Sequence, residues 1–169
     1  MNKMSVMLLL MLSAATAYAI EPADPARLDE VAERGSKVMP FNLEKTLHLF
    51  NKTETGGVQQ VIAKDAADVE QIALTRKHLA EIAASFAQGD FSGPQHIHGS
   101  NMPGVQELSA GARQVRFIYQ DLPDGGQIEY VTDKPELISA IHQFFDAQLS
   151  DHARHARPGE HAKHHGHQP

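Results

Sequence analysis

Two segments of the chain alternate between apolar and polar residues, and each has a turn in its middle. The first runs from residues 46–50 to residues 58–62, with a Gly-Gly pair in the connection. The second runs from residues 115–120 to residues 127–131 through a Leu-Pro-Asp-Gly-Gly turn. Alternation of this kind around a turn is typical of β-hairpins. The pattern therefore predicts four strands in two antiparallel pairs.

Apolar residues recur at helical spacing after each hairpin. Residues 67–87 carry one such stripe, and either Asp65 or Asp68 is suited to cap its start. A second stripe begins at Pro135, a residue that fits the first turn of a helix. We expect this second helix to end near Ala156. Each hairpin is thus followed by one amphipathic helix.

The remaining segments have weaker patterns. A short helix is expected over residues 29–37, because Pro40 restricts the residue before it to extended conformations. Residues 90–113 are rich in proline and glycine, and we expect a long irregular stretch there with one helical turn near residues 105–110. Long irregular loops inside a compact domain are uncommon and often functional.

The order hairpin, helix, hairpin, helix predicts an α+β fold. We interpret the two halves as duplicated ββα units that form a four-stranded antiparallel sheet with two helices packed on one face. The uncovered face of the sheet is then polar or meets a partner, and a homodimer through this face is a further expectation. The predicted boundaries are a signal peptide at 1–19, an N-terminal segment at 20–38, a single domain at 39–156 and a disordered His-rich tail at 157–169.

The first residues have the three parts of a secretory signal peptide. Lys3 is basic, residues 6–12 are apolar, and Ala17-Tyr18-Ala19 fits the cleavage rule for small residues. The apolar run is too short to span a bilayer, and no stop-transfer pattern follows it. We predict cleavage after Ala19 and a periplasmic product with no integral membrane segment. The alternative is a leader that stays uncleaved as an anchor.

Composition excludes several classes of protein. The chain has no cysteine, so disulfides, zinc-thiolate sites and thiol nucleophiles are excluded. The formal net charge of −6 argues against nucleic acid and anionic membranes as partners. There is also no Gly-x-Ser-x-Gly elbow for a nucleophilic serine. A soft metal ion would therefore have to be bound through histidine and methionine.

The segment from residue 93 to residue 104 carries the first candidate metal site. It contains His96, His98 and Met102 between prolines and glycines. In an extended backbone, residues two apart point to the same side, so both imidazoles would face one ion. Imidazole suits copper, zinc and nickel, and a thioether favours copper. The alternative is a surface loop with two incidental histidines.

Five further histidines are candidate metal ligands, each with a structural alternative. His78 and His142 hold similar places in the two predicted helices and would approach each other if the helices pack side by side. His48 lies in the first hairpin, where it would otherwise face solvent or stack on an aromatic neighbour. His152 and His155 are three residues apart, on one helix face. Residues 151–169 hold six of the 11 histidines, including these two, and short His-rich tracts are typical of metal binding.

Several motifs together resemble a known family. They are Asp90-Phe91-Ser92, His98-Gly99, Met102-Pro103-Gly104 and the run from Ala140 to His152, with His48-Leu49-Phe50 and His78-Leu79. In combination, over residues 39–152, they are similar to a family of small exported bacterial proteins of unsettled function, sometimes labelled aspartate carbamoyltransferase. The Ser-Thr-Arg-Thr-Arg phosphate loop of transcarbamoylases is absent here. The resemblance thus implies domain boundaries and highlights histidines but supplies no reaction.

These features predict a periplasmic transition-metal-binding protein for copper handling or tolerance, with zinc and nickel as alternative ions. One alternative is a small metal- or histidine-dependent enzyme with a closed pocket. Another is a protein that binds haem without a covalent link, because the sequence has no Cys-x-x-Cys-His motif. A partner-binding module without metal chemistry is the remaining alternative.

Overall fold

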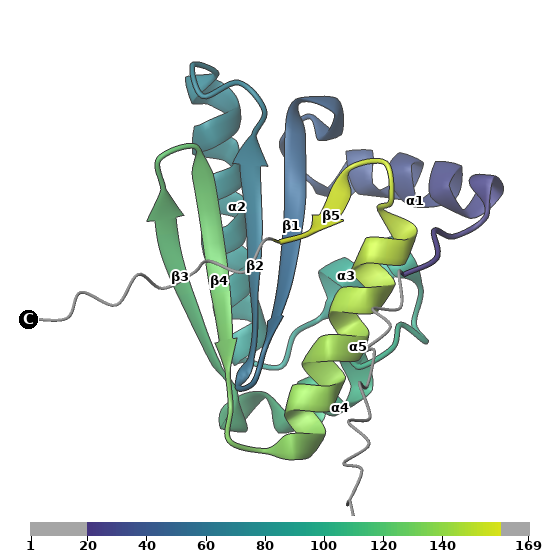
Figure 1. Cartoon of the computed structure of the whole chain (residues 1–169), viewed down its shortest axis with the longest axis vertical. Coiled ribbons are helices and arrows are strands. Elements are labelled where there is room, and N and C mark those ends of the chain that lie inside the picture. Colours follow the sequence, from purple (N-terminus) through teal and green to yellow (C-terminus); the bar gives the residue numbers. More distant parts are fainter. Residues whose placement is uncertain (1–19, 160–169) are drawn as a thin grey trace, which may run out of the picture.

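The computed structural model describes residues 20–159 and has an α+β architecture (Figure 1). Five strands form one sheet, and their bounds are β1 Thr46–Thr53, β2 Gly56–Ala63, β3 Arg116–Leu122, β4 Gly125–Val131 and β5 Ala156–Pro158. The five helices are α1 Pro25–Val38, α2 Val69–Ala87, α3 Ser92–His98, α4 Val105–Gly111 and α5 Pro135–Asp151. Two short 3-10 turns complete the fold, at Leu43–Lys45 and Ala112–Gln114. The predicted leader and residues 160–169 lie outside the described residues.

The sheet has the strand order β3-β4-β2-β1-β5. Both predicted hairpins are confirmed. They join through antiparallel pairing of β2 with β4, in which Gln60 lies opposite Gln127. The predicted sheet of four antiparallel strands was incomplete, since β5 lies parallel to β1 and makes the sheet mixed.

Strand β5 can form because α5 ends at Asp151, which leaves the following residues free to turn back. The helix stops at Asp151 instead of near Ala156, and a turn brings the chain back beside β1. The backbone N–H of His48 then donates to the carbonyl of His155 over 2.8 Å, and that of Gly159 donates to Phe50 over 2.8 Å. Residues 157 and 158, predicted as part of a disordered tail, therefore belong to the sheet.

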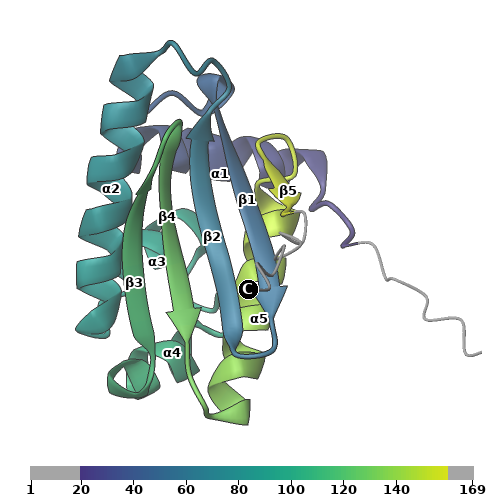
Figure 2. The same cartoon turned by 60° about the vertical axis from the view of Figure 1, so that its left-hand side comes forward.

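The two long helices cover the same face of the sheet, as predicted. Helix α2 packs on β3 and β4, and Figure 2 shows it beside β3 at the left of the view. Helix α5 packs instead on β1 and β2. The core between these layers is rich in aromatic side chains that are almost fully buried: Phe50, Phe86, Phe91, Tyr130, Phe144 and Phe145. None of the helices in residues 20–159 is long and apolar enough to cross a membrane.

The predicted irregular stretch is helical over much of its length. Asp90 accepts a hydrogen bond from the backbone N–H of Ser92 over 2.9 Å and so supports the start of α3. Pro94 lies in the first turn of α3, where its missing N–H costs nothing. Gly99 ends α3 at φ 97°, and Gly104 opens α4 at φ 77°. The helical turn expected near residues 105–110 is confirmed by α4, whereas α3 was not predicted, because proline and glycine mark helix ends as well as loops.

The predicted pairing of His78 and His142 depended on the duplication, which the structure does not match. His142 lies within hydrogen-bond distance of the turn of the first hairpin, where its Nε2 is 2.9 Å from the carbonyl oxygen of Gly56 and 3.0 Å from that of Thr53. Asp146, one helical turn after His142, forms an ion pair with Lys52. His142 therefore holds α5 against the hairpin.

Replacing His142 by alanine is expected to lower the free energy of unfolding by about 1–3 kcal/mol, because two turn carbonyls lose their donor. Urea unfolding at pH 7 measures this change. His96→Ala is the matched control, since His96 is exposed and no hydrogen bond of its side chain is seen. Equal urea midpoints for the two variants would contradict a structural role for His142.

Candidate functional site

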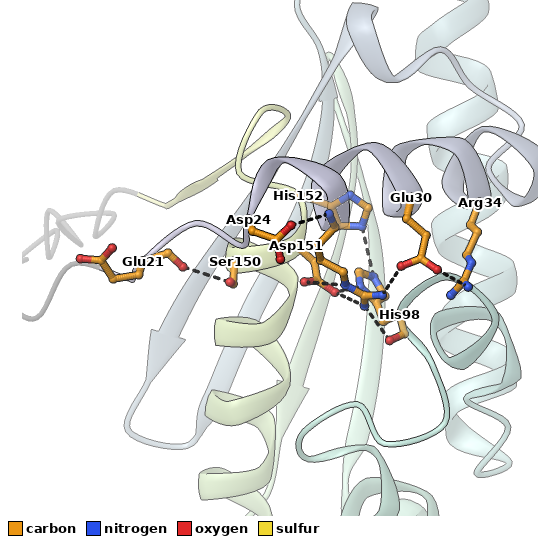
Figure 3. A network of polar contacts seen from close by, with 9 residues as sticks. Glu21, Asp24, Glu30, Arg34, His98, Ser150, Asp151 and His152 are labelled. Atoms are coloured by element: carbon orange, nitrogen blue, oxygen red, sulfur yellow. Dashed lines mark hydrogen bonds and ion pairs between the residues drawn. The ribbon is translucent and has the colours of Figure 1, made fainter.

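A buried polar cluster forms where α3 and α5 end. His98 is the last residue of α3, and Asp151 and His152 end α5 (Figure 3). Nδ1 of His98 lies 2.8 Å from Oδ2 of Asp151, and Nε2 of His98 lies 3.2 Å from Nε2 of His152. The side chain of His98 is only 2% exposed. A carboxylate and two imidazoles thus form a continuous chain of hydrogen bonds.

Arg27 of α1 completes the cluster from the other side. Its Nη2 donates to Oδ2 of Asp151 over 2.6 Å and to the backbone carbonyl of His98 over 2.7 Å. Burial alone would raise the pKa of Asp151, but hydrogen bonds from His98 and Arg27 lower it to about 2. Asp151 is therefore ionised at neutral pH and accepts the Nδ1 proton of His98. In the neutral form of His98, the lone pair is then on Nε2.

Helix α1 is tied to the end of α5 by several contacts besides Arg27. The N–H of Ala23 donates to the carbonyl of Ser150 over 3.1 Å, and the hydroxyl of Ser150 donates to the carbonyl of Glu21 over 3.0 Å. Arg154 also pairs with Asp29 at 2.6 Å. Val31, fully buried, anchors the helix in the core. The segment before residue 39 therefore forms one wall of the site.

A cavity of about 70 Å³ lies beside the histidine pair. His48, His98 and His152 line it with His78, Gln59 and Gln148. The rest of its lining is mainly apolar, from Val38, Met39, Val61, Leu79, Ile82, Pro94 and Ile97. Nδ1 of His48 is buried and has no hydrogen-bond partner within residues 20–159. A buried polar atom without a hydrogen-bond partner lowers the stability of the fold. A ligand that supplied the missing partner would therefore be bound favourably at this place.

Burial keeps three histidines of this site neutral. Burial lowers the pKa of His48 to about 4, although the nearby backbone of His155 opposes the shift. Burial also lowers the pKa of His78, and it lowers that of His152 well below its usual range. The rings of His48 and His152 are parallel, with centroids 5.6 Å apart. Each of these three imidazoles is therefore neutral near pH 7 and has one ring nitrogen that carries no proton.

The structure brings together four of the histidines expected to bind metal. His48, His98 and His152 are buried around the cavity, and His78 lines it from α2. His155 is buried close by but forms an ion pair with Glu44 at 2.6 Å. Its position in the turn before β5 differs from the expected helix face shared with His152.

The other expected ligands lie apart from this cluster. His96 is exposed on α3, because residues two apart on a helix point in nearly opposite directions. Met102 is buried in the hydrophobic core and does not line the histidine cavity, although it lines a second groove together with His98 and Asp151. His142 contacts the hairpin turn, as described above. The expected site formed by His96, His98 and Met102 in an extended loop does not form.

Sequence reasoning missed two charged residues of the cluster. Asp151 stands next to His152 in the chain, but its hydrogen-bond partner is His98, 53 residues away. Arg27 reaches Asp151 across 124 residues. An Asp-His pair directly after an amphipathic helix was a visible signal for Asp151, whereas nothing in the local pattern distinguishes Arg27 from other surface arginines.

Among residues 20–159, no group of three or more His, Asp and Glu side chains has the arrangement of a metal site. These side chains therefore offer at most a pair of closely facing nitrogen donors, on His98 and His152. No family model matches the chain, and no curated protein and no solved structure is significantly similar to it. The resemblance inferred from the sequence motifs stays a prediction.

Proposed function

We propose that the chain binds a transition-metal ion, with copper as the preferred ion, through His98 and His152. The observation that carries this proposal is the 3.2 Å separation of their buried Nε2 atoms. Two nitrogen ligands of a tetrahedral ion lie about 3.3 Å apart when each metal–nitrogen bond is about 2.0 Å long. In the metal-free chain, the same separation is bridged by one shared proton. The metal ion would take the place of that proton, which would move to Nδ1 of His152 or to solvent.

The surroundings of the pair support metal binding. A histidine that binds metal usually donates its other ring N–H to a carboxylate, which fixes the tautomer and raises the basicity of the ligand. Asp151 has this position on His98, and Arg27 holds Asp151 in place. Burial keeps His152 neutral, and only neutral imidazole binds a metal ion.

The preference for copper follows from the donors available. Imidazole binds copper, zinc and nickel, and divalent affinity peaks at copper. The chain has no cysteine that would favour zinc. With the predicted leader removed after Ala19, the site would act in the periplasm, in copper handling or tolerance. The His-rich tail would then serve as a weaker capture segment, and zinc and nickel would be competing ions.

Copper titration of the mature chain by calorimetry tests this proposal. Four histidines beyond residue 159 are first replaced by asparagine, so that they do not contribute to the measured copper binding. They are His161, His164, His165 and His167. On this background we expect one copper ion per chain. His98→Gln and His152→Gln should each weaken the affinity by about a hundredfold or more. His96→Gln should leave it unchanged.

A second measurement covers the case in which a buried substitution disturbs folding. X-ray absorption at the copper edge of the background chain should show scattering from two imidazole rings. Far-ultraviolet circular dichroism of each variant reports whether it is folded. Unchanged copper affinity in a folded His98→Gln or His152→Gln variant overturns the proposal, and so does the loss of all copper binding when only the tail histidines are replaced.

A histidine-dependent enzyme is the second candidate, and one observation favours it. Asp151, His98 and His152 form a relay that reaches a cavity, and a carboxylate-oriented imidazole is a competent general base. This candidate gains support if the folded chain binds no metal. Haem is not supported, because ligand pockets of that class measure about 300–1,000 Å³, whereas this cavity measures about 70 Å³.

A further inference from the structure

The histidine pair leaves the coordination of a metal ion incomplete. Within residues 20–159, no third His, Asp or Glu side chain joins His98 and His152 in a metal-like arrangement. Structural zinc sites have four protein ligands, so two imidazoles alone do not make one. Additional donors have to come from other side chains that line the cavity. Three of these carry a suitable atom: Met39, Gln59 and Gln148.

Gln59 is already engaged. Its Oε1 accepts a hydrogen bond from the buried hydroxyl of Tyr130 over 2.5 Å. Turning this amide toward a metal ion would leave the Tyr130 hydroxyl without its partner, at a cost of about 1–3 kcal/mol. Two donors therefore remain, the thioether of Met39 and the amide of Gln148.

Met39 is held beside His152 by the end of α1. Its backbone N–H donates to the carbonyl of Gly35 over 2.8 Å and closes the last turn of the helix. A β-carbon at Gly35 would lie 2.7 Å from Cε of Met39 and 4.0 Å from Cε1 of His152. The methyl group of Met39 and the imidazole of His152 thus border the same space, which a side chain at Gly35 would fill. The side chain of Met39 is buried, at 8% exposure.

We propose that Met39 supplies a thioether ligand beside His98 and His152, and that the ion bound there is copper(I). This inference rests on the proposed metal-binding function. Thioether and imidazole are neutral donors, and thioether sulfur selects copper(I) over harder ions. Copper(I) is satisfied by two or three ligands, whereas copper(II) and zinc(II) require more. A mainly apolar cavity also disfavours a doubly charged ion more strongly than a singly charged one.

The expected role of methionine is thus retained, but with a different residue. Sequence proximity pointed to Met102 as the sulfur donor for His98. Both methionines belong to the hydrophobic core, but Met39 lines the histidine cavity, whereas Met102 lines a second groove with His98 and Asp151. The two methionines are similarly buried, at 8% for Met39 and 6% for Met102, and so form a matched pair for an experiment.

The test measures copper(I) affinity without oxygen, by competition with a chromophoric copper(I) chelator, in the mature chain without tail histidines. Met39→Leu should weaken copper(I) affinity by about tenfold or more and leave zinc affinity unchanged. Met102→Leu should change neither affinity. Copper-edge X-ray absorption should show a copper–sulfur contribution in the background chain and in Met102→Leu, and none in Met39→Leu.

The outcomes separate this inference from the proposed function. Copper(I) affinity that is unchanged by Met39→Leu but lost in His98→Gln overturns the role of Met39 and leaves the histidine site standing. Equal losses of copper(I) and zinc in Met39→Leu also overturn it, because they indicate a general change of structure. If neither His98→Gln nor His152→Gln changes copper(I) affinity, the proposed histidine site is itself wrong.

Discussion

The metal-free chain should lose several kcal/mol of folding free energy when the pH falls from 6.5 to 4. Burial lowers the pKa of His48 to about 4 in the folded state, whereas an unfolded histidine titrates near 6.5. Between these two values the unfolded chain binds more protons than the folded chain, so its stability falls with the pH. His48 alone contributes a loss of about 3 kcal/mol over this window.

Other groups around His48 act in the same direction. The pKa values of His152 and His78 are also lowered by burial, and each adds a loss as the pH falls below 6.5. Hydrogen bonds from His98 and Arg27 lower the pKa of Asp151 to about 2, so its contribution to stability is lost as the pH falls from about 5 toward 2. The loss of stability between pH 6.5 and about 5 therefore comes from the histidines. Between pH 7 and about 9 the stability should change little.

Urea unfolding of the chelator-treated chain at pH 7, 5.5 and 4 measures this dependence. His48→Leu removes the titrating group. The free energy of unfolding lost between pH 7 and pH 4 should then be smaller by about 3 kcal/mol than in the unchanged chain. His96→Leu, at an exposed position of α3, should keep the full slope. The assignment to His48 fails if His48→Leu shows the same slope as the unchanged chain.

The elements that the sequence predicted correctly are those with a long repeating pattern. Alternation located both hairpins, and helical spacing located α2 and α5, because each pattern reflects one face turned to the core. Strand β5 has only three residues and owes its place to β1, so no local pattern marks it. The short helix α3 was missed because Pro94 and Gly99 also occur at helix ends.

The site was predicted in part for a related reason. His98 and His152 were recognised as candidate ligands, but proximity in the chain gave them the wrong partners, His96 and His155. On a helix, residues two apart are about 200° apart, so His96 and His98 face opposite ways. Helix packing pairs His98 with His152 instead. Asp151 and Arg27 join them through tertiary contacts that no sequence spacing records.

Gly104 follows the segment that contains His98, and it allows this part of the chain to pack closely against α5. This residue has φ 77°, and a β-carbon on it would lie 2.1 Å from the carbonyl oxygen of Ala140 in α5. Gly104→Ala therefore combines an unfavourable backbone conformation with a clash against backbone that cannot move aside. We expect a loss of about 3–5 kcal/mol in the free energy of unfolding, measured by urea denaturation at pH 7.

Alanine substitutions at two other glycines distinguish the effect of the backbone conformation from the effect of the clash. Gly99 has φ 97° but nothing within 4 Å of an added β-carbon, so Gly99→Ala should cost only about 1–2 kcal/mol of conformational strain. Gly93 lies in α3 with no positive φ and no close neighbour, so Gly93→Ala should be neutral or stabilise by up to about 1 kcal/mol. If Gly104→Ala costs no more than Gly99→Ala, the close contact with α5 does not hold this segment. Because that contact lies on α5, which ends at Asp151 beside His152, a folded Gly104→Ala variant should also lose copper affinity.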